Sequence, residues 1–321
     1  MRSGSLLTLI GAGLAAAKLG GDLEARRYEY VDLEATKPPG HLAHVPGVGR
    51  IHYLDQGEGP AVVLLHGLGA STYSFRLNLP EIARGRRVIA VDLPGHGFTS
   101  RDVADLSLTA QAGYLASLLD LLSLERVALV GHSMGGSIAQ RFAVAYPERV
   151  ARLVLIASTT DDFMLRAAGA SPWLAPFVPA FVAAVLHNHP VRRRWLSRAV
   201  YDPAYLTPEV IAAYEAPGHI RGHTRAYQRL MRDRRRDARI DLGRIRAPTL
   251  IIWGDTDRIV SLRHGETLAR GISGSRLVVL PRTGHLVPEE QAEAVNRLLT
   301  DFLGEKTAGP GGLRAEGVQP S

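Results

Sequence analysis

The ten-residue segment VALVGHSMGG, from Val127 to Gly136, constrains the fold of this chain more than any other. An apolar run of strand character leads directly into a Gly-x-Ser-x-Gly motif centred on Ser133. Residues 137–146 then show helical spacing, which stops at Pro147. A serine on a sharp strand-to-helix turn presents its hydroxyl for attack, and the flanking glycines let neighbouring backbone approach closely. We therefore predict that Ser133 is a nucleophile on such a turn.

A serine hydroxyl needs a base within hydrogen-bond reach, and the base needs an orienting acid. An apolar strand at 249–254 ends in a loop with two candidate acids, Asp255 and Asp257. A later apolar strand at 276–280 is followed by a loop that carries His285 and then by a helix expected from Glu289 to Phe302. His285 is therefore expected at the carboxyl edge of a parallel sheet, where ligand sites lie. Ser133, one of the two aspartates and His285 are predicted to form a catalytic triad.

The charged oxygen that forms when serine attacks a carbonyl needs backbone N–H donors. One donor is the residue after the nucleophile, Met134, and the second comes from the loop after an earlier strand. Residues 61–70, AVVLLHGLGA, indicate a buried strand that runs into a His-Gly loop, so Leu68 is the predicted second donor. The histidines within these and neighbouring motifs, His66, His96 and His132, are expected to serve turns or packing.

Four separated motifs resemble the α/β-hydrolase superfamily: LLHGLGAS, VDLPGHGFTS, GHSMGG, and WGDTDRIV with the later TGH. The resemblance covers about residues 50–304 and is strongest to cap-bearing serine hydrolases. These include carboxylesterases, lipases, carbon–carbon bond hydrolases of aromatic degradation and cofactor-free haloperoxidases. Haloalkane dehalogenases and epoxide hydrolases carry an aspartate at the elbow, so Ser133 argues against both. The W-G-x-x-D spacing resembles the acid loop of the superfamily and favours Asp257, with Asp255 capping the turn through its own backbone.

Sheet and helix signals alternate along most of the chain. Strands are expected near 51–55, 61–66, 87–92, 126–131, 153–157, 249–254 and 276–280. Helix-length segments between them predict an α/β fold with a mostly parallel sheet covered by helices on both faces. The resemblance implies eight strands. Asp92, the last residue of the third of these strands, is expected to support a structural turn.

The alternation breaks between residues 158 and 246, where helix-like segments occur without a convincing strand. This region is predicted to form a helical cap on a core built from residues 21–157 and 247–304. Trp173, Phe177 and Phe181 recur at helical spacing within it and are expected either to line a substrate pocket or to form plain core. Residues 305–321 are rich in glycine, proline and charge and are expected to be disordered.

The composition limits which cofactors and partners are expected. The chain has no cysteine, no H-E-x-x-H pattern and no glycine-rich loop ending in G-K-[ST], so neither a metal nor another cofactor is expected. The net charge of +7 comes largely from arginines clustered at 192–194 and 232–236. The second cluster is interrupted by an acid, and neither is interleaved with aromatic residues that would stack on bases. We predict a small-molecule substrate and no nucleic acid, and the oligomeric state is left open.

Residues 1–20 form an apolar segment that contains Ala15-Ala16-Ala17 and follows Arg2. Its apolar run of about 12 residues is too short to cross a ~30 Å hydrocarbon core. A secretory signal, an interfacial membrane anchor and a helix packed on the domain are the alternatives. The sequence therefore leaves the location open between the cytoplasm and a membrane-associated or exported state.

Hydrolysis of small to medium hydrophobic carboxylic esters is the first functional hypothesis from the sequence. The second is hydrolysis of a carbon–carbon bond in a ring-cleavage diketone, whose acidic substrate could be bound by an arginine such as Arg192 or Arg225. Cofactor-free perhydrolysis is a further alternative. A non-catalytic binding protein on the same fold is disfavoured because all three triad residues are present.

Overall fold

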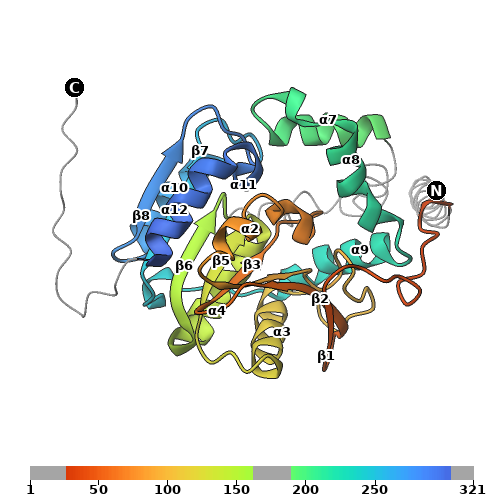
Figure 1. The fold of residues 1–321 in the computed structure, drawn as a ribbon, viewed down its shortest axis with the longest axis horizontal. Helices are drawn as coiled ribbons and strands as arrows, with labels where there is room; N and C mark the ends of the chain where they lie inside the picture. The colour runs from red at the N-terminus through yellow and green to blue at the C-terminus, as the bar shows by residue number, and fades with distance from the viewer. Residues whose placement is uncertain (1–26, 162–188, 305–321) are drawn as a thin grey trace, which may run out of the picture.

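The computed structural model describes residues 27–161 and 189–304, which fold around one eight-stranded sheet (Figure 1). The strand order is β1-β2-β4-β3-β5-β6-β7-β8. β2 pairs antiparallel with both β1 and β4, and every other pairing is parallel. The strands are β1 His41–Val45, β2 Gly49–Gln56, β3 Ala61–Leu65, β4 Arg87–Val91, β5 Val127–His132, β6 Val150–Ile156, β7 Thr249–Gly254 and β8 Arg276–Leu280. The predicted mostly parallel α/β sheet is confirmed.

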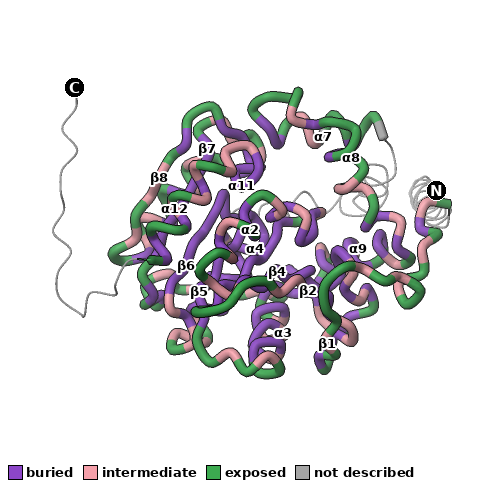
Figure 2. The backbone as a smooth tube through the Cα atoms, viewed as in Figure 1, coloured by how far each residue is buried: buried purple, intermediate pink, exposed green. Residues whose placement is uncertain are grey.

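The central strands form the core. Every residue of β3, β5 and β7 is buried, which explains why these segments are apolar without alternation (Figure 2). β1 was not predicted, because its sequence HLAHV has two histidines and only its last residue is buried. An edge strand such as β1, which buries one side chain, has too weak a hydrophobic pattern to detect. β6 was predicted but starts at Val150, three residues before the predicted start.

Helices flank the sheet. The longer ones are α3 Leu108–Leu121, α4 Met134–Ala145, α10 Leu262–Gly271 and α12 Ala292–Gly304, with the short α2 at Leu79–Ile82. α3 packs against α4, and α2 packs against α12. The single C-terminal helix predicted from Glu289 to Phe302 is instead two helices, because Gln291 leaves the helical region at φ −127° and ψ 44° and separates α12 from α11 Val287–Glu290. None of the described helices is both long and apolar enough to span a bilayer.

The described residues between β6 and β7 form helices joined by turns and irregular segments. They include α7 His189–Ala199, α8 Pro208–Glu215 and α9 His223–Asp233, which are called the inserted helices below. A small apolar cluster joins them to the core through Leu286, which packs with residues of α7, α8 and the turn between them, among them Val200, Leu206 and Ile211. Trp173, Phe177 and Phe181 lie outside the described residues, as do residues 1–20 and 305–321.

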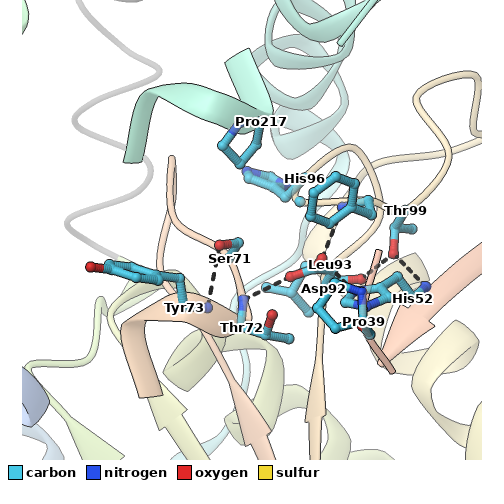
Figure 3. Close-up of polar contacts among 12 residues, drawn as sticks. Pro39, His52, Ser71, Thr72, Tyr73, Asp92, Leu93, His96, Thr99 and Pro217 are labelled. Atoms are coloured by element: carbon cyan, nitrogen blue, oxygen red, sulfur yellow. Dashed lines mark hydrogen bonds and ion pairs between the residues drawn. The ribbon is translucent and has the colours of Figure 1, made fainter. Parts of the chain in front are cut away.

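Asp92 ties together the turn that follows β4 (Figure 3). Its buried carboxylate accepts hydrogen bonds from Thr72 N at 2.7 Å and Phe98 N at 2.8 Å, and pairs with His52 Nδ1 at 2.7 Å. Burial alone would raise the pKa of Asp92, but the hydrogen bond and charge of His52, the charge of His66 and the hydrogen bond from Phe98 N together hold the pKa at about 2. This bonding fits the structural role that the sequence predicts for Asp92.

We expect Asp92→Asn to lower the free energy of unfolding by about 3 kcal/mol or more, because it breaks a buried ion pair. The depressed pKa means that the carboxylate stabilises the fold above its unfolded pKa of about 3.9 and loses that contribution as pH falls towards the folded pKa of about 2. Urea unfolding at pH 7 and pH 3 measures both effects. Asp120→Asn is the control, because its carboxylate is 67% exposed. Equal unfolding midpoints for the two variants would refute this account of Asp92.

Candidate active site

Ser133 lies on the turn between β5 and α4. Its backbone has φ 53° and ψ −116°, a conformation that costs free energy in a residue other than glycine. Gly135 makes the turn possible, because a methyl group at that position would collide with the carbonyl groups of Leu65 and His66. The tight strand-to-helix turn therefore holds the Ser133 side chain at the carboxyl end of β5.

A chain of hydrogen bonds joins three predicted site residues. His285 Nε2 lies 3.0 Å from Ser133 Oγ, and His285 Nδ1 lies 2.7 Å from Asp257 Oδ2. The other oxygen of Asp257 accepts hydrogen bonds of 2.8 Å from Ile259 N and Val260 N, and its side chain is fully buried. A carboxylate only accepts, so Nδ1 carries the proton and Nε2 is left to accept the proton of Ser133. This arrangement can activate a serine nucleophile.

Asp255 has a different position from Asp257. Its carboxylate accepts a 3.2 Å hydrogen bond from Thr283 N, in the loop that leads to His285. The expected cap on its own turn is thus wrong, because the partner comes from the next strand's loop. The bond instead ties the acid loop to the histidine loop.

His132 supports His285 from the elbow. Its Nε2 donates a 2.8 Å hydrogen bond to the His285 carbonyl, and the two ring centroids are 5.0 Å apart. Burial, with the charge of His285, lowers the pKa of His132 to about 3, so the ring is neutral near pH 7. The sequence suggested only a turn or packing role for His132, because a contact across 153 residues cannot be seen without the fold.

We expect His132→Leu to reduce kcat about ten- to hundredfold, because small displacements of a catalytic group cost this much. Steady-state kinetics with any substrate that the enzyme turns over measures this loss of kcat. The matched control is His44→Leu, at an exposed position of β1. If His132→Leu keeps kcat within twofold of the wild type, His132 does not position His285.

The loop that carries the predicted oxyanion donor Leu68 lies next to Ser133, and the other predicted donor, Met134, follows Ser133 in the chain. A methyl group on Gly67 would lie 3.1 Å from Ser133 Cβ, so the His-Gly loop directly adjoins the nucleophile. Within residues 27–161 and 189–304, no hydrogen bond is donated by the N–H of Leu68 or Met134. Free donors beside a nucleophile suit an oxyanion, and this role stays a prediction for both residues.

The two arginines considered for an acidic substrate lie in different environments. Arg192, on α7, is 8% exposed, and its Nη1 lies 3.6 Å from Glu215. Burial lowers its pKa, which the charge of Glu215 partly offsets. Arg225 is exposed on α9. Among the described residues, no group of three histidine or acidic side chains suits a metal ion.

Fold and site together define a hydrolase with a Ser-His-Asp arrangement. The family model for the alpha/beta hydrolase fold matches residues 60–292, and the chain belongs to that family. A 2-hydroxy-6-oxo-6-phenylhexa-2,4-dienoate hydrolase of Comamonas testosteroni is 35% identical over 271 residues, covering 80% of this chain and 92% of that protein.

Two solved structures are also similar. A meta-cleavage product hydrolase of Pseudomonas fluorescens IP01 superposes with a TM-score of 0.70 at 28% identity, covering 83% of this chain and 97% of its own. A thermophilic esterase from Thermogutta terrifontis has a TM-score of 0.67 at 27% identity, covering 85% of this chain and 97% of its own. A dienoate hydrolase, a meta-cleavage product hydrolase and an esterase are therefore among the proteins similar to this chain.

Proposed function

We propose that this protein hydrolyses the carbon–carbon bond between C5 and C6 of a 2-hydroxy-6-oxo-dienoate. The observation that carries the proposal is the 35% identity, over 80% of the chain, to an enzyme named for such a substrate. The Ser133–His285–Asp257 arrangement supplies the nucleophile and the proton carrier that this reaction needs. The ester hypothesis from the sequence becomes the second candidate.

The chemistry begins when the dienol shifts its 2-hydroxyl proton to C5, giving a 2,6-diketone. Ser133 Oγ attacks C6 while His285 accepts the serine proton, and the N–H groups of Leu68 and Met134 receive the oxyanion. The C5–C6 bond then breaks, and its electron pair passes through the conjugated chain to the C2 oxygen. His285 returns the proton to this dienolate, which leaves as a 2-hydroxydienoate.

The second half of the reaction frees the enzyme. Water, deprotonated by His285, attacks the acyl-serine at the former C6 and releases a carboxylic acid. One water is consumed in total, and no oxidant, metal or cofactor is required. The leaving group is a dienolate where an ester would release an alcohol, and the acyl-enzyme half-reaction is common to both substrates.

The inserted helices, which we propose cover the site as a cap, supply positive charge for an acidic substrate. Arg192 is the stronger of the two arginine candidates, because a guanidinium that is 8% exposed is desolvated and interacts strongly with an anion. Arg225 is exposed, so water screens its charge and it is the weaker candidate.

Ester hydrolysis is favoured by one observation, the likeness to the Thermogutta terrifontis esterase. The same serine, base and oxyanion donors can attack an ester carbonyl. We propose that simple esters are turned over as a secondary activity with a lower kcat/KM than the dienoate.

The test compares kcat/KM for 2-hydroxy-6-oxo-6-phenylhexa-2,4-dienoate with kcat/KM for p-nitrophenyl esters of increasing acyl length. The dienoate is expected to be preferred at least tenfold. An enzyme that hydrolyses the esters and leaves the dienoate intact would refute the proposal and establish the ester hypothesis. Arg192→Met should raise KM for the dienoate and leave that for a neutral ester unchanged.

A further inference from the structure

A buried donor and a buried acceptor lie together beside the loop that carries Leu68. Tyr227 on α9 is 5% exposed, and His96 in the turn after β4 is 2% exposed. Their ring centroids are 5.3 Å apart. Within the described parts of the chain, neither the Tyr227 hydroxyl nor His96 Nε2 has a hydrogen-bond partner. Because an unpaired buried polar group costs free energy, two of them side by side indicate a ligand that completes their bonding.

The Tyr227 hydroxyl faces the predicted oxyanion loop. A methyl group on Gly69, which has φ 76°, would lie 2.8 Å from the Tyr227 hydroxyl oxygen. Gly69 directly follows Leu68, so this hydroxyl touches the loop that carries the predicted oxyanion donor. This contact is what places the pair beside the proposed substrate site.

The protonation of the pair follows from its contacts. His96 Nδ1 lies 3.0 Å from the Pro94 carbonyl oxygen, which can only accept, so Nδ1 carries the proton and Nε2 offers a lone pair. Burial lowers the pKa of His96 well below its usual value, so the ring stays neutral near pH 7. Burial likewise raises the pKa of Tyr227, so its hydroxyl stays protonated.

The surroundings hold the pair rigidly. Figure 3 shows His96 between Asp92 and Pro217, which lies in the 3₁₀ turn Ala216–His219 between α8 and α9. The buried Arg101 guanidinium joins the same parts, donating hydrogen bonds to the carbonyl oxygens of His96 at 2.8 Å and Pro217 at 3.2 Å. A methyl group on Gly95 would be 3.4 Å from the Ala226 side chain, so α9 packs directly on the turn. Polar groups fixed in this way are suited to specific recognition.

We propose that Tyr227 and His96 bind a hydroxyl group of the substrate, with Tyr227 donating to its oxygen and His96 Nε2 accepting its proton. An enol or phenol hydroxyl both accepts and donates, whereas a ketone, an ether or a carboxylate has no proton for His96. The identity of this hydroxyl rests on the proposed function. It is the one on C2 of the dienoate, four carbons from the C6 carbonyl that Ser133 attacks.

The same contact acts during bond cleavage. The C2 oxygen takes the electron pair of the C5–C6 bond, so the hydrogen bond from Tyr227 strengthens as that charge develops. Tyr227 thereby binds hydroxylated ligands more tightly than their deoxy analogues and stabilises the charge that forms on the C2 oxygen.

The test is Tyr227→Phe with two ligand pairs that differ by one hydroxyl. The first pair is the dienoate and its 2-deoxy analogue, compared by binding in a Ser133→Ala background, because an analogue without the C2 oxygen has no acceptor for the C5–C6 electron pair and is not cleaved. The second is 4-hydroxybenzoate and benzoate, whose hydroxyl carbon is likewise four bonds from the carboxyl carbon, compared by calorimetric binding. The protein that retains Tyr227 should prefer the hydroxylated member of each pair about tenfold or more, and Tyr227→Phe should lose that preference. The variant should keep its Tm, because it removes only an unpaired hydroxyl.

Tyr146→Phe, at a tyrosine that packs on Phe142, is the matched control and should retain the preference. Failure of the wild type to bind or prefer either hydroxylated ligand would overturn the inference, as would a Tyr227→Phe effect equal on both members of a pair. If the dienoate is not cleaved but 4-hydroxybenzoate is preferred by wild type and not by Tyr227→Phe, the proposed function fails and the hydroxyl site stands.

Discussion

Ser133→Ala is expected to lower kcat by on the order of 10⁵-fold, because the nucleophile of a hydrogen-bonded triad has no substitute in the site. Ser133 is the only one of the three triad residues that forms a bond to the substrate in the proposed reaction. The measurement is turnover of the dienoate and of a p-nitrophenyl ester, together with labelling by a fluorophosphonate followed by intact mass. Both activities and the label should be lost together.

The control for this substitution is Ser137→Ala, one helical turn further along α4. Ser137 Oγ lies 2.7 Å from the Thr159 carbonyl and is buried, so its loss costs stability of about 1 kcal/mol without touching the reacting atoms. Its kcat should stay within threefold of wild type. A Ser133→Ala protein that retained a tenth of its activity would show that another group attacks the substrate.

Asp257→Asn is expected to lower kcat about 10⁴-fold with little change in KM. The asparagine amide would present a donor where the carboxylate accepts, so His285 would take the wrong tautomer and could not accept the serine proton. Asp255→Asn is the matched control, two residues away in the same loop, and should keep most of the activity because its partner is Thr283 N. Steady-state kinetics on both variants separates the two aspartates.

The opposite result would reassign the acid. Full activity in Asp257→Asn with a large loss in Asp255→Asn would mean that the 2.7 Å contact between His285 and Asp257 is not the one used in turnover. Equal small losses in both variants would show that the histidine does not need a carboxylate partner.

The elements that were predicted from the sequence are those marked by a continuous pattern of residues within one segment. The elbow around Ser133 and the buried strands on either side of it are continuous motifs, and the loop positions of Asp257 and His285 follow from the ends of two apolar strands. Parallel strands place such loops at one edge of the sheet, so the three residues were expected to meet. The structure brings them within hydrogen-bond distance.

Features that depend on distant packing were not predicted. The bond from His132 to the His285 carbonyl and the approach of Tyr227 to Gly69 each join segments far apart in the chain. Neither residue stands out in the sequence, since a histidine or tyrosine on an apolar face is usually a core residue. β1 was missed because it buries one side chain, and the break at Gln291 has no proline or glycine to mark it.

The most direct test of carbon–carbon hydrolysis is product analysis of 2-hydroxy-6-oxo-6-phenylhexa-2,4-dienoate incubated with the wild-type protein in ¹⁸O-labelled water. The account predicts that benzoate and 2-hydroxypenta-2,4-dienoate form in equal amounts, with solvent oxygen in the benzoate, and that Ser133→Ala forms neither. An unchanged dienoate alongside rapid hydrolysis of p-nitrophenyl esters would contradict it.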